Sequence, residues 1–143
     1  MSKMKWIAVV LLGMLVLGFV YRMTTIDDRN AAVVDDIKSN PDGDRAKRAM
    51  LLYLEDGRMY PVNYLREDGL VFVGIDGLWW REFEGHGAPV KLLIRGQKHH
   101  GHANTVLDDP AYKEAVFARL RPTAPEWLPD WLNGKLVVIQ LED

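Results

Sequence analysis

The chain of 143 residues contains no cysteine, and it contains no serine after Ser39. The first absence excludes disulfides, thiolate metal sites, a cysteine nucleophile and an acylated lipoprotein cysteine, and it leaves the redox compartment open. The second excludes a serine nucleophile from most of the chain. Because a Gly-x-Ser-x-Gly elbow, a Walker-type loop and a Gly-x-Gly-x-x-Gly turn are also missing, the sequence does not support serine-hydrolase, P-loop or Rossmann chemistry.

A charge excess of one sign is also lacking. Residues 45–143 carry 13 Lys and Arg against 14 Asp and Glu. Such a balanced surface produces no strong field toward polyanions. We therefore expect no nucleic-acid partner.

An uncharged, almost wholly apolar run of 16 residues extends from Trp6 to Tyr21. A helix of that length is roughly 24 Å long, and Arg22, which can snorkel, together with residues 23–26 extends it toward the ~30 Å of a bilayer core. Trp6 and Tyr21 lie where interfacial aromatic rings are expected. Residues 1–26 therefore predict a single-pass transmembrane anchor in a bacterial-type inner membrane.

A cleaved signal peptide is the alternative, since Lys3 and Lys5 precede the apolar run. The run is followed by no small-x-small cleavage pair, which favours the uncleaved anchor. Basic residues lie on both flanks, so the positive-inside rule leaves the side of the soluble domain open.

Residues 27–44 contain six Asp and end in a cluster of turn formers, which predicts a polar linker with room for a short helix. From residue 45 to 143, short apolar runs alternate with turn residues, as in a β domain. Pro61 cannot donate to a ladder and implies an open edge, a bulge or a ligand-facing position. We expect strands over residues 49–54, 59–65, 70–75, 90–95, 98–107 and 135–141, with tight turns at Asp56-Gly57 and Gly96-Gln97.

A helix is expected to begin after Asp109-Pro110, which match an N-cap and a first helical position, and to end before Pro122. The nearly continuous β-branched run from Lys135 to Leu141 is typical of a strand covered on both faces. The fold class that follows is mainly β (α+β), a six-stranded antiparallel barrel with one or two helices behind an N-terminal transmembrane helix.

Histidines cluster at residues 99, 100 and 102. On a strand His100 and His102 share one face and His99 lies on the other, so the three cannot converge on a metal without a bulge. No carboxylate on the same strand completes a ligand set. We expect no metal site here.

Two segments combine groups that suit a planar ligand with an anionic tail. Residues 57–64 bring together an arginine, tyrosines, an amide and a proline-interrupted strand, and residues 76–81 add two tryptophans and a second arginine. The alternative is that Trp79 or Trp80 only plugs the end of the barrel.

These residues also carry a family resemblance. The segments 60–69, 79–83 and 87–96, in that order, resemble the deazaflavin-dependent nitroreductase and quinone reductase family, which are split β-barrel proteins related to flavin reductases. The resemblance covers residues 47–141. It implies a cofactor, coenzyme F420 or FMN, and hydride transfer to a quinone or nitro-aromatic acceptor, with a homodimer as a further expectation by analogy. The cofactor-binding positions that it implies are Arg58, Tyr60, Pro61, Val62, Asn63, Trp80 and Arg81; no catalytic acid or base is implied, because the ring supplies the reactivity.

Two positions depart from the family pattern. The basic phosphate loop is shortened here to residues 56–59, and Glu82 stands where the family often has asparagine. Charge-assisted contacts contribute about 1.5–3 kcal/mol each, so these departures weaken phosphate binding. A cofactor-free binding or assembly module at the membrane is therefore the alternative function.

Overall fold

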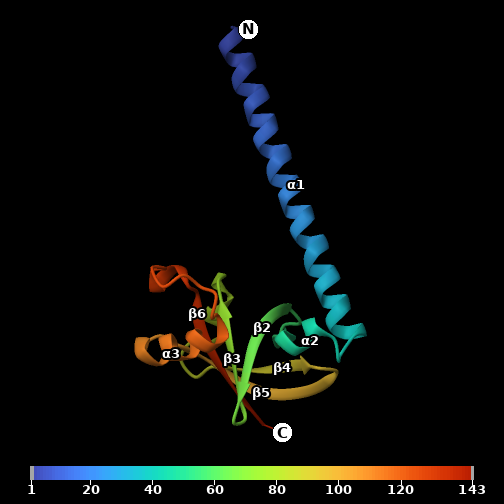
Figure 1. The fold of residues 1–143 in the computed structure, drawn as a ribbon. Helices are drawn as coiled ribbons and strands as arrows, with labels where there is room; N and C mark the ends of the chain where they lie inside the picture. Colours follow the sequence, from blue (N-terminus) through green and yellow to red (C-terminus); the bar gives the residue numbers. More distant parts are fainter. Residues whose placement is uncertain (1, 143) are drawn as a thin grey trace. The chain divides into compact units, whose positions relative to one another are not determined.

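The structure is a computed structural model that describes residues 2–142. Contacts divide the chain into two compact units, residues 1–35 and residues 36–143. The first unit is helical and the second contains all the strands (Figure 1).

Helix α1 (Lys3–Ser39) begins the chain as one unbroken α-helix. Its segment Lys3–Arg22 has a mean hydropathy of 2.1 and none of it is buried, so the predicted apolar helix is confirmed and is long enough to cross a bilayer. Residues 27–39, expected as a polar linker with only a short helix, continue the same helix. The helix ends just before Asn40-Pro41, because the residue before a proline is disfavoured in the α conformation. Membrane insertion and the domain boundaries at residues 26 and 44 stay predictions.

The second unit begins within the last turn of α1. Ile37 is fully buried in this unit, and Asp36 forms an ion pair with Arg45 at 3.1 Å between Oδ2 and Nε. Helix α2 (Asp44–Arg48) follows and buries Ala46 before the first strand.

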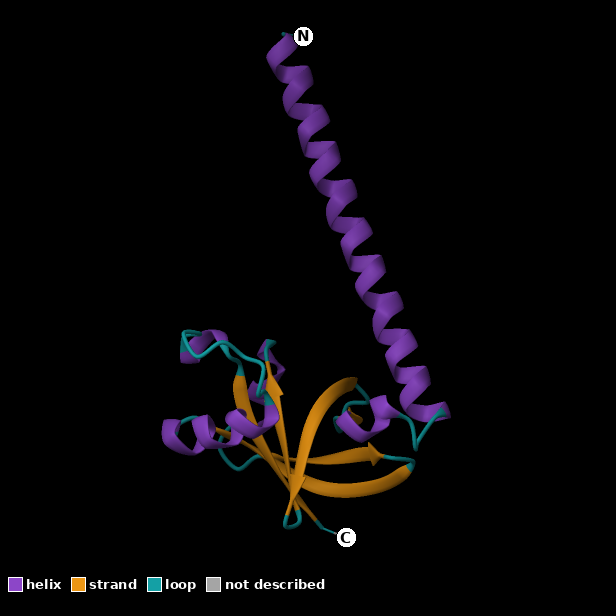
Figure 2. Ribbon diagram, in the orientation of Figure 1, coloured by secondary structure: helices purple, strands orange, loops and turns teal. Residues whose placement is uncertain are grey.

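The six strands close into an antiparallel barrel with the order β1-β2-β3-β6-β5-β4. Figure 2 shows the strands in orange and the helices in purple. This arrangement confirms the predicted fold class. The final strand lies between β3 and β5 and closes the barrel. The strands are β1 (Ala49–Tyr53), β2 (Met59–Glu67), β3 (Leu70–Ile75), β4 (Ala88–Ile94), β5 (Gln97–Val106) and β6 (Lys135–Leu141).

Alternate residues of each strand fill the barrel interior, as the period of two requires. Val71, Val73 and Ile75 of β3 belong to this interior cluster. Phe72 points to the outer face, where it packs with Val116 and other residues of α3 (Pro110–Leu120). The helix has the predicted start, with the Asp109 carboxylate accepting a hydrogen bond from the Tyr112 N–H at 3.1 Å. Residues on both faces of β3 and β6 are therefore covered, which explains their continuous apolar runs.

Two hairpin turns differ from the expected form. β1 and β2 are joined by a longer loop than the predicted Asp56-Gly57 pair: the Leu54 N–H donates to the Arg58 carbonyl, and Gly57 takes a positive φ of 91°. A three-residue loop with glycine in the left-handed region is a common hairpin alternative. The β4–β5 turn lies at Arg95-Gly96, one residue earlier than predicted.

Two short 3-10 helices complete the fold. η1 (Leu78–Phe83) connects β3 to β4 and buries Phe83, and η2 (Asp130–Leu132) precedes β6.

Candidate functional site

Strand β2 changes its partner halfway along its length. Residues 59–63 pair with β1, whereas the pairing with β3 begins only at Tyr64 and continues to Glu67. On the β3 side, residues 59–63 therefore have no sheet partner. Pro61 lies in this open stretch, so of the three alternatives that it implied, an edge, a bulge or a ligand-facing position, the structure shows the edge.

A cleft of about 350 Å³ lies at this split between β2 and β3. We call it the β2–β3 cleft. Its walls are residues 60–63 of β2, residues 74–77 at the end of β3, Trp79 of η1, and Leu120 and Arg121 at the end of α3. The volume is at the lower end of the range for small-molecule sites.

Trp79 forms the aromatic wall of the cleft. Its indole stacks on the ring of Tyr60 with 4.1 Å between centroids and 5° between planes, and it meets Phe83 edge to face. Trp80, the next residue, does not line the cleft. The cationic groups of Arg81 and Lys135 each lie over its ring, 5.6 Å from the centroid, and its carbonyl accepts a hydrogen bond from the Thr105 hydroxyl.

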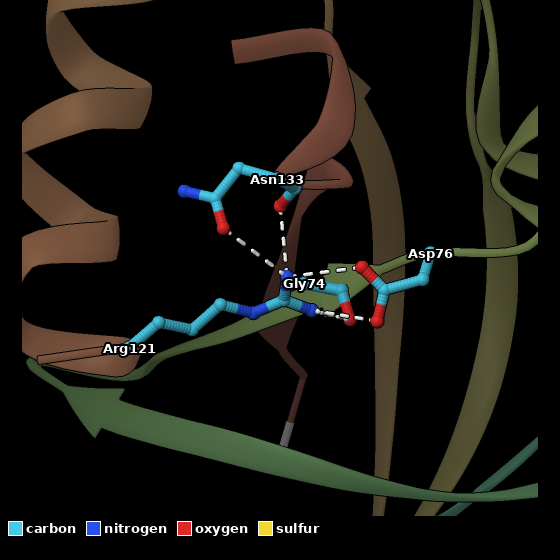
Figure 3. A network of polar contacts seen from close by, with 4 residues as sticks. All are labelled: Gly74, Asp76, Arg121 and Asn133. Atoms are coloured by element: carbon cyan, nitrogen blue, oxygen red, sulfur yellow. Dashed lines mark hydrogen bonds and ion pairs between the residues drawn. The ribbon is translucent and has the colours of Figure 1, made fainter. Parts of the chain in front are cut away.

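Arg121 supplies the positive charge of the cleft (Figure 3). Its guanidinium donates to both carboxylate oxygens of Asp76, at 3.0 and 3.2 Å, to the Gly74 carbonyl at 3.0 Å and to the Asn133 carbonyl at 2.8 Å. The Arg121 side chain is 25% exposed and that of Asp76 is 71% exposed. The arginine is thus anchored by carbonyls, and its one negative partner among these contacts faces solvent.

Arg58 lies in a different polar group. Its guanidinium donates to Asp56 at 2.7 Å and to Glu82 at 2.8 Å. The hydrogen bond from the Arg58 backbone N–H, with that from its side chain, lowers the pKa of Asp56, while the bonds to Glu82 and Asp56 raise the pKa of Arg58. Two carboxylates already compensate this cation, and Glu82 is the residue at which the sequence departs from the family pattern.

The predicted site residues divide into two groups. Tyr60, Pro61, Val62 and Asn63 line the β2–β3 cleft together. Arg58, Trp80 and Arg81 do not line it. Their assignment to a cofactor stays a prediction.

The predicted set missed the cleft residues outside β2, and three of them supply its aromatic and charged groups: Trp79, Asp76 and Arg121. Trp79 was visible in the sequence only as one of two adjacent tryptophans, and periodicity inside a 3-10 helix cannot say which one faces a cavity. Asp76 and Arg121 are 45 residues apart in the chain. No local signal connects them.

The histidines alternate along β5 as predicted: His99 is half-buried and shares its face with the buried Gly101 and Ala103, and His100 is exposed. His102 is half-buried as well. His102 donates through Nε2 to the His86 carbonyl at 2.7 Å. Within the part of the chain that the structure describes, no group of three or more histidine or carboxylate side chains is placed to hold a metal ion.

The cleft fits one part of a flavin-type cofactor better than the other. Trp79 and the open backbone edge of residues 59–63 suit a planar ring with hydrogen-bonding edges. The cleft offers fewer partners to the phosphate of such a cofactor. Among the described residues that line the cleft, Arg121 is the only cation, and Asp76 already holds it.

No protein-family model matches this chain, and no curated protein matches it in sequence. Its structure is similar to that of a candidate pyridoxamine 5'-phosphate oxidase from Listeria innocua, with a TM-score of 0.55 and 12% identity over 82% of this chain and 94% of that chain. It is also similar to an FAD-binding protein from Mesorhizobium loti (TM-score 0.43, 17% identity, 79% and 89% coverage) and an FMN-binding protein from Syntrophomonas wolfei (0.36, 11%, 87% and 92%). Of these three, only the first has a TM-score above 0.5. At 12% identity it establishes the fold alone.

Proposed function

We propose that the protein is a membrane-tethered oxidoreductase that binds the planar ring of a flavin or of F420 in the β2–β3 cleft. The observation that carries this proposal is the coincidence of three features at one place. The open edge of β2, the stacked rings of Trp79 and Tyr60, and Arg121 all border the same cleft. The family that the sequence resembles implies the same chemistry for residues 60–63.

The residues of the cleft would bind and orient the ring. Trp79 offers a flat apolar wall, and the sheet-free edge of residues 59–63 offers backbone donors and acceptors to the polar edge of the ring. A bound isoalloxazine or deazaflavin ring supplies the hydride chemistry, so the protein needs no acid or base of its own.

The proposed acceptor is a quinone or a nitro-aromatic compound. A lipid-soluble quinone partitions into the bilayer, and the helix Lys3–Arg22 is long and apolar enough to hold the barrel there. The membrane anchor is thus the reason to favour a quinone. The side of the membrane on which the barrel lies determines whether a cytoplasmic cofactor can reach it.

A cofactor-free binding module is the second candidate. The commitment of Arg58 to two carboxylates and of Arg121 to Asp76 favours it, because a phosphate would have to displace one of these partners. Breaking one such charge-assisted hydrogen bond costs about 1.5–3 kcal/mol, which a phosphate would have to offset.

The two candidates are separated by titrating the full chain in detergent with riboflavin, FMN and F420. Riboflavin has the ring of FMN without its phosphate. If the ring dominates recognition, riboflavin and FMN should bind with similar affinity, with dissociation constants of tens of micromolar or below. Absence of binding by all three ligands would contradict the proposed function.

Variants at the two adjacent tryptophans locate the ring. Trp79→Ala should weaken binding about three- to tenfold, because an aromatic contact contributes about 0.5–1.5 kcal/mol. Trp80→Ala tests the position that the family resemblance implies, and Lys91→Ala, which is exposed on β4, is the matched control. Menadione reduction that is lost in Trp79→Ala would exclude the cofactor-free module.

A further inference from the structure

The segment between α3 and β6 exposes large apolar side chains. Trp127 is 78% exposed, Trp131 74% and Leu132 51%, and Leu78 at the start of η1 is 70% exposed. Exposed indoles are unusual on a soluble surface, because tryptophan is mostly buried on average. Four such side chains indicate an interaction surface.

The hydrogen bonds of Arg121 connect the chain segments that carry the two parts of this surface, residues 127–132 and Leu78. Arg121 binds the Asn133 carbonyl and the Asp76 carboxylate at the same time (Figure 3). A Cβ built on Gly134 would lie 2.8 Å from Asp76 Oδ1, so the two segments touch. Leu132 directly precedes Asn133, and Leu78 follows Asp76 by two residues. Because Asp76 and Arg121 line the β2–β3 cleft, the segments that carry the exposed side chains adjoin this cleft.

We propose that residues 127–132, with Leu78, insert into the interfacial layer of a lipid bilayer and form a second membrane contact of the barrel. This inference rests on the membrane anchor of the proposed function. Tryptophan is enriched at the membrane–water interface, where its ring enters the apolar layer and its N–H stays hydrated. A pair of exposed indoles beside leucines has that character.

The chain itself keeps a bilayer within reach of this surface. The candidate span ends at Arg22, and the barrel unit begins at Asp36. The 13 residues between them are helical and cover about 20 Å at 1.5 Å per residue. A barrel held on so short a connection meets the lipid surface at a high effective concentration.

The charges of the segment indicate that the contact is apolar rather than electrostatic. Between Pro122 and Gly134 the sequence has Glu126 and Asp130 and no Lys or Arg. Anionic headgroups would therefore not strengthen it. Docking of this surface would turn the mouth of the cleft toward the lipid phase, where a quinone is dissolved.

The test is fluorescence quenching of the full chain in phosphatidylcholine vesicles whose acyl chains carry bromine. A Trp6→Phe variant removes the tryptophan of the anchor and keeps Trp79, Trp80, Trp127 and Trp131. A Trp6→Phe/Trp127→Phe/Trp131→Phe variant is the matched control. Brominated lipid should quench up to about half of the emission of the first variant, since two of its four indoles lie in the interface, and little of the second.

Equal quenching of the two variants would overturn the proposal. The difference in emission between the two variants reports Trp127 and Trp131. If this emission shifts to the blue as protein concentration rises in ordinary lipid, the surface is an interface with a second copy, which also overturns the proposal. Replacing a quarter of the lipid by phosphatidylglycerol should not increase the quenching, and a clear increase would contradict the apolar contact. The unmodified chain keeps Trp6, so the absence of additional quenching in it shows that the anchor has not inserted. Cofactor binding is measured in detergent without vesicles and therefore tests the proposed function separately.

Discussion

The β4–β5 and β2–β3 hairpins begin from the same kind of turn and differ in how far their strands stay paired. Each turn places a residue and then a glycine at positive φ: Arg95 and Gly96 in one, Asp68 and Gly69 in the other. β4 and β5 pair over seven successive residues, whereas β2 and β3 pair over four. Beyond Tyr64 the second hairpin opens into the cleft.

The difference teaches that the turn alone does not determine the extent of a hairpin. Pro61 cannot donate a hydrogen bond, and in the register of this hairpin it would lie opposite Asp76, beyond the end of β3 at Ile75. Regular pairing makes the scaffold, and its interruption makes the candidate site.

The largest effect on stability is expected in the regularly paired β4–β5 hairpin. Leu92 of β4 is 1% exposed and lies opposite Leu52 in the register of β1 and β4. Leu92→Ala should lower the free energy of unfolding by about 2–5 kcal/mol, because it removes buried methyl groups and leaves a cavity. Denaturant titration followed by circular dichroism measures this loss. The exposed neighbour Lys91→Ala should change stability by less than about 0.5 kcal/mol, and a similar effect of both substitutions would contradict the distinction.

A matched pair of glycines compares the two hairpins directly. A Cβ on Gly101 of β5 would lie 2.7 Å from Ile139 Cγ2 and 2.9 Å from the Gln140 carbonyl oxygen, so backbone would have to move. On Gly74, at the split, it would meet the guanidinium of Arg121 at 2.7 Å, and that side chain can rotate away. Gly101→Ala should therefore cost about 1–3 kcal/mol and Gly74→Ala less. The same denaturant titration measures both costs.

The Gly74→Ala variant also tests the Arg121 network. Displacement of the guanidinium would loosen its contacts with Asp76 and the Asn133 carbonyl. We expect faster amide hydrogen exchange in residues 130–134 of this variant and not of Gly101→Ala. A larger stability loss in Gly74→Ala than in Gly101→Ala would show that the barrel is more rigid at the β2–β3 cleft than in the β4–β5 hairpin.

The smallest effect concerns Tyr64, at the point where β2 begins to pair with β3. Burial raises the pKa of the Tyr64 phenol, whose Oη donates to the Ala46 carbonyl at 3.3 Å. In the unfolded chain the phenol ionises near pH 10, before it does so in the folded protein. The stability from the neutral phenol is thus complete below about pH 10 and is lost as the pH rises through the raised folded pKa.

Thermal unfolding between about pH 9 and 11 measures this effect. Tyr64→Phe should reduce the alkaline loss of stability, whereas Gln97→Ala, in the exposed β4–β5 turn, should keep it. An unchanged pH dependence in Tyr64→Phe would contradict the role of this phenol.

Local patterns in the sequence determined most of the elements. The continuous apolar run predicted the N-terminal helix, and short apolar runs bounded by turn residues predicted β3 and β6 at their observed bounds, because a strand covered on both faces is apolar at nearly every position. Asp109-Pro110 predicted the start of α3, because capping is a contact between residues three apart. Pro61 predicted an open edge, a bulge or a ligand-facing position, since a missing N–H is a property of one residue.

The tertiary structure decided what lies across that edge. Trp79 rather than Trp80 faces the cleft because η1 is a 3-10 helix, and Arg121 reaches Asp76 only because α3 packs on the outside of β3. The exposure of Trp127 and Trp131 is also a property of packing, since the same side chains would suit a core. These features depend on contacts between distant residues, and a single sequence records the residue types without recording which of them meet.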